Sequence, residues 1–212
     1  MSKKAVLITI IILFHIVGLI GFLTPALQPL FLKIVPFHLL LMLVLIVYSH
    51  QSFNLKFAYF FASLFVFGFV LEWIGVHHHL IFGNYVYGRT LGVRLFDIPL
   101  MIGVNWFLLT YATGVLMQHL GFKNLNTRVI LGAAVLVLLD ILIEPVATQF
   151  DYWHWITMPG SLTAPIENYI GWFLAGGLML GIFEAFKFTR QSMVAVVLLI
   201  SQFLFFGILN MV

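Results

Sequence analysis

The chain has 212 residues, of which 63% are hydrophobic and only 8% are charged. This apolar fraction lies well above the roughly 45–50% of ordinary globular domains and indicates a single integral membrane domain over residues 1–212. The net charge of +3 comes from a few scattered basic residues and predicts no nucleic-acid partner, and the lack of cysteine excludes disulfides and thiolate metal sites.

Seven apolar segments follow one another along the chain, each close to the ~20 residues that cross a ~30 Å hydrocarbon core. The first follows Lys3 and Lys4 as in a signal peptide, but it has no clear cleavage site near Gly21 and is expected to be retained. We therefore predict an all-α polytopic membrane bundle of about seven transmembrane helices. The predicted helices cover residues 5–23, 30–48, 56–76, 98–118, 128–147, 167–186 and 192–211.

The basic residues predict how this bundle is oriented. With seven crossings the two termini lie on opposite sides, and most Lys and Arg residues fall on the side of the N-terminus. That side would hold Lys3, Lys4, Lys56, Lys123, Arg128, Lys187 and Arg190, and the other would hold Lys33, Arg89 and Arg94. The positive-inside rule then predicts a cytoplasmic N-terminus in the cell (inner) membrane.

The acidic residues gather at the opposite, outer end of the predicted bundle, together with two long loops over residues 77–97 and 148–166. An acidic side chain at membrane depth is costly, so a one-sided cluster predicts a functional site near the outer face. The cluster comprises Glu72, Asp97, Asp140, Glu144, Asp151 and Glu167.

Asp140 and Glu144 are spaced four residues apart and share one helix face. Because like charges repel and the surroundings are apolar, we expect at least one of them to be protonated at neutral pH and able to act as a general acid. Pro145 follows at once and opens the helix locally. The structural alternative is a pair bonded to Arg89, Arg94 or a neighbouring helix.

Three further polar residues on the predicted helices are candidates for the same site. Glu72 is either the second member of an acid/base pair or a cap or ion pair with a loop arginine. Asn168 is a better inward-facing candidate than Glu167, because an acid in a first helical turn already interacts favourably with the helix dipole. Asn105 is expected to bond across helices or to hold a water molecule.

The triple histidine at residues 77–79 does not predict a metal site. Consecutive side chains on a helix diverge by ~100° each and rarely meet at one ion. The other histidines do not form the separated boxes that membrane di-iron enzymes need. We therefore predict neither a metal nor a cofactor.

Five blocks between residues 65 and 175 resemble, in order, those of the membrane carotenoid hydratases, the CruF-type carotenoid biosynthesis family. They are residues 72–76 (EWIGV) with 82–88 (FGNYVYG), 99–100 (PL) with 105–106 (NW), 140–147 (DILIEPVA), 152–155 (YWHW) and 165–172 (PIENYIGW). Two departures bear on the substrate. Glu144 stands where many relatives have aspartate, and residues 158–163 replace the Gly and Tyr usual before the last block.

The resemblance implies a carotenoid 1',2'-hydratase, a cofactor-independent hydro-lyase. It would add water to the terminal double bond of a ψ-end group in a linear or monocyclic carotene, such as lycopene or γ-carotene, and give a tertiary alcohol. The partners implied are the carotenoid, water and the lipid bilayer, with possible association with other carotenoid biosynthesis enzymes.

The depth and chemistry of the side chains suggest a role for each. We expect Asp140 to be the acid because it lies deepest, with Glu144 and Glu72 holding the water or acting as base. Aromatic faces would stabilise the tertiary cation by roughly 0.5–2 kcal/mol each. The predicted substrate-binding residues are Trp73, Tyr85, Tyr87, Asn105, Trp106, Asn168 and Trp172.

Two other functions fit some of the same residues. A membrane lycopene cyclase would use the same cation but form a ring instead of an alcohol. A proton-coupled transporter would use the acids as a relay, yet it would be expected to show repeated or broken helices, and the chain has no paired repeat.

Overall fold

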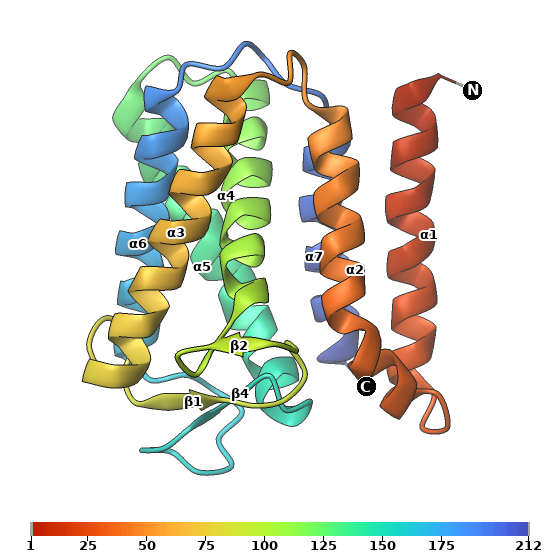
Figure 1. Ribbon diagram of the computed structural model, residues 1–212, viewed down its shortest axis with the longest axis vertical. Helices are drawn as coiled ribbons and strands as arrows, with labels where there is room; N and C mark the ends of the chain where they lie inside the picture. Colours follow the sequence, from red (N-terminus) through yellow and green to blue (C-terminus); the bar gives the residue numbers. More distant parts are fainter. Residues whose placement is uncertain (1, 212) are drawn as a thin grey trace.

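Seven α-helices make up most of the chain in the computed structural model, which describes residues 2–211 (Figure 1). They are α1 (Lys3–Leu23), α2 (Gln28–Ser49), α3 (Leu55–His78), α4 (Leu100–Leu120), α5 (Leu125–Gln149), α6 (Ile166–Ala185) and α7 (Val194–Leu209). The first six are long and apolar enough to cross a membrane, whereas α7 has 16 residues and is shorter than predicted. The predicted all-α membrane bundle is confirmed.

Local sequence signals set the ends of these helices. Asn54 caps α3 by accepting a hydrogen bond from the backbone N–H of Phe57 at 3.2 Å, and Ser2 caps α1 in the same way. Gly121 ends α4 in the left-handed conformation, with φ of 74°, which a residue without a Cβ adopts at little cost.

Four short strands organise the two long loops and were not predicted from the sequence. Strand β1 (Tyr85–Tyr87) pairs antiparallel with β4 (Trp153–Trp155), so that Tyr85 lies opposite Trp155 and Tyr87 opposite Trp153. Strand β2 (Arg94–Leu95) pairs with β3 (Ile98–Pro99), which delays the start of α4 to Leu100. The two loops therefore form one structured layer beneath the bundle.

Helix α4 is at the centre of the bundle, where it packs against α2, α3, α5, α6 and α7 (Figure 1). Helix α1 packs on α2 and α7 at one side. The chain enters α1 at one end of the bundle and leaves α7 at the other, the end that carries the strands. The predicted arrangement of the termini on opposite sides agrees with this path.

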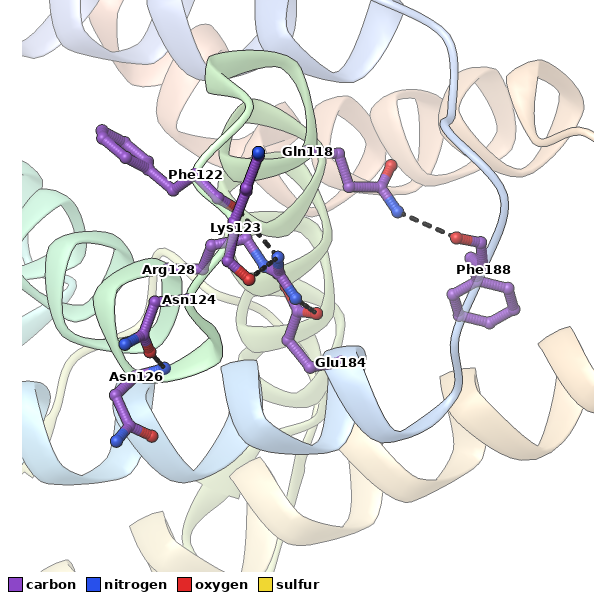
Figure 2. Close-up of polar contacts among 8 residues, drawn as sticks. All are labelled: Gln118, Phe122, Lys123, Asn124, Asn126, Arg128, Glu184 and Phe188. Atoms are coloured by element: carbon purple, nitrogen blue, oxygen red, sulfur yellow. Dashed lines mark hydrogen bonds and ion pairs between the residues drawn. The ribbon is translucent and has the colours of Figure 1, made fainter.

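The end of the bundle away from the strands contains the seventh carboxylate, Glu184 on α6. Arg128 of α5 binds it with two parallel hydrogen bonds of 2.8 and 2.7 Å (Figure 2). Arg128 also donates to the backbone carbonyl of Phe122 at 2.8 Å, and Gln118 donates to that of Phe188 at 3.1 Å. These contacts tie the connections after α4 and α6 to the helices, so Glu184 has a structural role.

Candidate active site

Glu72 lies in the last turns of α3 and is buried against the strand layer. Its Oε2 accepts hydrogen bonds from the hydroxyl groups of Tyr85 at 2.5 Å and Tyr87 at 2.6 Å. Its Oε1 accepts a third from the indole N–H of Trp106 on α4 at 2.9 Å. The alternation of side chains along β1 places both tyrosines on the same face. Three donors therefore surround one carboxyl group.

The two tyrosines stay neutral donors over a wide pH range. Burial raises the pKa of the Tyr85 and Tyr87 hydroxyl groups well above the ordinary range, and the neighbouring Glu72 carboxylate raises both further. A phenol loses its proton only above its pKa, so both hydroxyl groups keep donating to Glu72 throughout the physiological range.

Glu144 is the second buried carboxyl group of the site, next to Pro145 on α5. Its Oε2 accepts hydrogen bonds from the indole N–H groups of Trp155 at 2.9 Å and Trp153 at 3.2 Å. Its Oε1 accepts one from the side-chain amide of Asn168 at 3.2 Å. Strand β4 and the first turn of α6 thus hold Glu144 from two sides.

Asp140 lies one helical turn deeper, roughly 14 Å from the outer end of α5. It is fully buried, and its Oδ2 accepts a hydrogen bond of 2.7 Å from the same amide nitrogen of Asn168. Its Oδ1 has no hydrogen-bond partner in the structure. Asn168 therefore bridges the two acids of α5, and its amide group is the hydrogen-bonded link between Asp140 and Glu144.

Arginine does not neutralise these three acids. Among residues 2–211, the ion pairs join Arg128 to Glu184, His77 at the end of α3 to Asp97 and His154 of β4 to Asp151, and none involves Glu72, Asp140 or Glu144. Arg94 instead donates to the backbone carbonyl of Gly88. The arginine part of the structural alternative is therefore not found in this part of the chain, whereas the neighbouring helix α6 does bond both acids of α5 through Asn168.

A small cavity of about 30 Å³ lies between Glu72 and Glu144. It has room for roughly one or two water molecules, and its polar lining supplies the partners that such water needs. The lining residues are Glu72, Phe82, Tyr85, Tyr87, Ile102, Asn105, Trp106, Glu144, Trp153, Trp155, Asn168 and Trp172.

A much larger cavity of about 410 Å³ lies between α1, α2, α4, α5 and α7. Its lining is almost entirely aliphatic and aromatic. Ile102, Asn105 and Trp153 line both cavities and form the wall that separates them. A long apolar molecule in the large cavity would therefore meet the acids across this wall.

Aromatic rings close the small cavity on the side of α4 and α6. The rings of Trp106 and Trp172 are 4.5 Å apart between centroids, and Phe82 stacks on Trp106 at 6.3 Å. Trp73 lies elsewhere, since its side chain is exposed on α3 and stacks on His77 at 5.2 Å. Trp73 is thus the predicted substrate-binding residue that the structure keeps apart from the site.

The structure brings most of the predicted site residues together around the small cavity: Glu72, Tyr85, Tyr87, Asn105, Trp106, Glu144, Asn168 and Trp172. Asp140 lines neither of the two cavities, although it was predicted to be the acid. Sequence reasoning missed Trp153 and Trp155, which donate to Glu144. The alternation in Tyr152–Trp155 was the available signal, because it places these two indoles on one strand face.

The other three carboxylates at this end of the bundle lie outside the buried site. Asp97 and Glu167 are exposed. Asp151 accepts hydrogen bonds from the backbone N–H of Arg89 at 3.0 Å and from His154 at 2.8 Å, and so joins the two loops. No group of three or more His, Asp or Glu side chains within residues 2–211 is arranged to hold a metal ion.

Comparison with known proteins gives a matching family and a curated relative. The family described as carotenoid biosynthesis protein matches residues 32–212. A bisanhydrobacterioruberin hydratase from Haloarcula japonica is 29% identical over 135 residues, which cover 62% of this chain and 45% of the relative. The chain thus spans about 45% of the length of the curated relative it matches. No solved structure matches the chain.

The family match includes most of α2, all of α3 to α7 as the structure describes them, both loops and every residue that lines the small cavity. The same blocks that carry the resemblance in the sequence supply the buried carboxyl groups and their donors. This membrane bundle therefore belongs to the carotenoid biosynthesis protein family.

Proposed function

We propose that this protein is a carotenoid 1',2'-hydratase that adds water to the terminal ψ-end double bond of a linear or monocyclic carotene. The observation that carries the proposal is the water-sized cavity between two buried carboxyl groups, which is separated by a thin wall from a large apolar cavity. The similarity to the bisanhydrobacterioruberin hydratase of Haloarcula japonica supports the same class of reaction. Neither the cyclase nor the transporter alternative gains support from the comparisons.

The reaction needs a proton and a water molecule, and the site offers places for both. A carboxyl group gives its proton to the less substituted carbon of the terminal alkene, and the pair of π electrons forms the new C–H bond. Water adds to the tertiary cation that remains, and a carboxylate takes the extra proton from the oxygen. The sum is one water added, with no oxidation or reduction.

The geometry favours Glu144 over Asp140 as the group that gives the proton. Glu144 lines the small cavity, whereas Asp140 lies behind Asn168 and lines neither cavity. We assign Asp140 the role of a positioning residue that acts on Glu144 through the Asn168 amide. Glu72 accepts three hydrogen bonds of 2.5, 2.6 and 2.9 Å, whereas two of the three that Glu144 accepts are 3.2 Å long. The shorter bonds stabilise the anionic form of Glu72 more, so it suits the role of the base.

The aromatic rings around the small cavity would stabilise the cationic intermediate. Trp106 and Trp172 line the small cavity, next to the place where the cation would form on the chain end, and an aromatic face is worth roughly 0.5–2 kcal/mol toward a cation. Phe82 lines the cavity beside them. These rings also keep bulk water out, so the cation meets the water already held between the carboxyl groups.

The site lies at the end of the bundle that carries the strands, and we propose that this end faces outward from the cell membrane, with a cytoplasmic N-terminus. The excess of Lys and Arg at the opposite end supports this orientation. A substrate dissolved in the lipid would then reach water near the outer interface.

Pigment analysis in a lycopene- or γ-carotene-producing host tests the proposal. Wild-type protein is expected to yield carotenoids heavier by one water molecule, whereas cyclisation would leave the mass unchanged. General acid–base groups contribute roughly 10²–10⁴-fold to rate, so Glu144→Gln and Glu72→Gln should lose the product by a factor in that range. Asp140→Asn should keep a measurable fraction.

Asp97→Asn is the matched control, because it also removes a carboxylate at the outer end but changes an exposed residue. It should hydrate like the wild type at equal membrane levels. Undiminished product from both Glu144→Gln and Asp140→Asn would remove the proposed acid machinery, and an unchanged pigment profile with the wild type would remove the hydratase function.

A further inference from the structure

Asn105 on α4 is the polar side chain of the small cavity that bonds neither carboxyl group. Apart from Glu72 and Glu144 themselves, every other polar side chain that lines this cavity donates a hydrogen bond to one of them. Within residues 2–211 the Asn105 amide makes no hydrogen bond, and neither of its polar atoms is closed off as Oδ1 of Asp140 is. The amide is therefore able to bind a molecule that comes from outside the chain.

The accessible surface of Asn105 faces the interior of the bundle. Helix α4 packs against five other helices, and every other residue from Ile102 to Val115 is buried. Asn105 is only partly buried, and it lines both the small and the large cavity. Its amide therefore lies at the boundary between a water-sized space and an apolar one.

The neighbours of Asn105 on α4 fix this position. Trp106, the next residue, donates to Glu72 at 2.9 Å and so holds this turn of the helix beside the proposed base. Ile102 lies one turn earlier on the same side of α4 and lines both cavities with Asn105. Since Ile102 has no polar side-chain atom, Asn105 is the part of this α4 wall that can hold water.

The large cavity borders on lipid between α1 and α2. Several of its lining residues are also exposed on the outside of the bundle, namely Phe14, Val17, Ile34 and Phe37. An apolar chain can therefore enter sideways from the membrane. Its end would come to rest against the wall that contains Asn105, with the small cavity directly behind.

We propose that Asn105 holds the attacking water molecule and thereby determines whether the cation is hydrated or returns to an alkene. The amide oxygen accepts one hydrogen of the water and a carboxylate accepts the other, which leaves a lone pair of the water oxygen for the tertiary carbon. The inference rests on the proposed function, because it names the residue that sets the product of that reaction.

The tertiary cation has a second fate that needs no water. A carboxylate can remove a proton from a carbon next to the cationic carbon, and the C–H electron pair then forms a double bond again. The sum is an unhydrated alkene, with no oxidation or reduction. In D₂O the acid delivers a deuteron, so a cation that returns by losing ordinary hydrogen leaves deuterium on the unhydrated carotene. The ratio of hydrated product to deuterated, unhydrated carotene therefore reports on the water position separately from protonation.

Full-length protein in lipid nanodiscs that contain lycopene, incubated in D₂O and analysed by mass spectrometry, measures both products. The wild type should give mainly hydrated lycopene. Asn105→Leu keeps the branched shape but cannot bond to water, so the ratio should fall roughly tenfold, the upper end of what one hydrogen bond gives, while deuterium uptake continues. Asn105→Ser keeps a hydroxyl group in a smaller side chain, and its ratio should fall less.

Thr113→Val is the matched control and should keep the wild-type ratio. It also removes a polar group from α4, but Thr113 lines neither cavity and its hydroxyl group has no partner in the structure. Glu144→Gln should lose hydration and deuterium uptake together, because it removes the proposed proton donor.

A wild-type ratio in the Asn105 variants would overturn the role of Asn105, and so would the joint loss of hydration and deuterium uptake at wild-type membrane levels. The serine variant, whose side chain fits in the space of asparagine, carries the test where the leucine variant does not insert. A wild type that neither hydrates nor deuterates lycopene would instead remove the hydratase function, and the role of Asn105 with it.

Discussion

Gly75 sets how closely α3 approaches β1 beside Glu72. A Cβ at this position would lie 2.7 Å from the Tyr85 hydroxyl oxygen and 3.1 Å from the Phe82 ring. The Tyr85 hydroxyl donates to Glu72, so the absence of a side chain at residue 75 is part of the geometry of the proposed site. Gly75 also belongs to the block of residues 72–76 that carries the family resemblance.

We expect Gly75→Ala to lower hydration while leaving the helix intact. Alanine is the better helix former, but its methyl group must displace Tyr85 from Glu72, and overpacking of this kind costs roughly 1–3 kcal/mol. The product yield per membrane-inserted protein, measured by mass spectrometry, should fall roughly tenfold. Gly181→Ala is the control, because a Cβ there has open space. Equal yields from both variants would show that Tyr85 need not stay in place.

Tyr85 and Tyr87 also predict the alkaline side of the pH profile. The pKa of each hydroxyl group is raised well above its ordinary range, chiefly by burial and then by Glu72, so neither should lose its proton between pH 7 and 9. Replacing Tyr87 by Phe should lower the hydration rate without shifting the profile over that range. A fall in wild-type rate below pH 9 that disappears in Tyr87→Phe would contradict this.

At the scale of elements, the pairing of β1 with β4 joins two loops more than 60 residues apart and places donors on both carboxyl groups. Tyr85 and Tyr87 from one strand reach Glu72, and Trp153 and Trp155 from the other reach Glu144. The sequence predicts two long loops at this end of the bundle. It does not predict the pairing, because three-residue strands are too short to show a period.

Asp151 holds the ends of this strand layer, so its loss should loosen the loops. Burial alone would raise the pKa of Asp151, but hydrogen bonds from His154 and the backbone of Arg89 outweigh burial and lower it. The carboxylate therefore stabilises the folded loops above its ordinary pKa, and this contribution is lost as the pH falls through the lowered value.

Asp151→Asn imitates the protonated acid at neutral pH. Residue 151 has a φ of 58°, which asparagine tolerates, so the change removes charge without backbone strain. Trypsin should cut the reconstituted variant at the exposed Arg89 several times faster than the wild type, as measured by mass spectrometry of the fragments. Asp97→Asn is the control, because it changes an exposed carboxylate in the loop that contains Arg89, and this variant should be cut at the wild-type rate. Equal cutting rates for the Asp151→Asn and Asp97→Asn variants would contradict the proposed role of Asp151.

At the scale of the whole molecule, hydrophobicity alone predicts the bundle, because membrane helices need only length and apolar composition. The observed helices, including the shorter α7, begin and end within three residues of the predicted ones. The two cavities cannot be predicted from hydrophobicity, because side chains from many helices form them and these side chains share no sequence pattern. Gln202 in an apolar run was visible in the sequence, but its burial without a partner was not.

The absence of cysteine makes the predicted orientation easy to test. Single-cysteine variants at Thr157, in the loop after β4, and at Asn126, at the start of α5, place one thiol at each end of the bundle. A membrane-impermeant maleimide should label Thr157→Cys in intact cells and Asn126→Cys only after lysis. The reverse pattern would invert the predicted topology and put the site on the cytoplasmic face.

The wall between the two cavities also suggests an order in which water and the chain end bind. A chain end seated against Ile102, Asn105 and Trp153 stands between the large cavity and the space beside the carboxyl groups. That space has room for roughly one or two water molecules. We therefore expect water to be loaded before the chain end arrives, and each turnover to end with the alcohol withdrawing before the next water is admitted. On this view the bound carotenoid itself closes the small cavity while the reaction takes place.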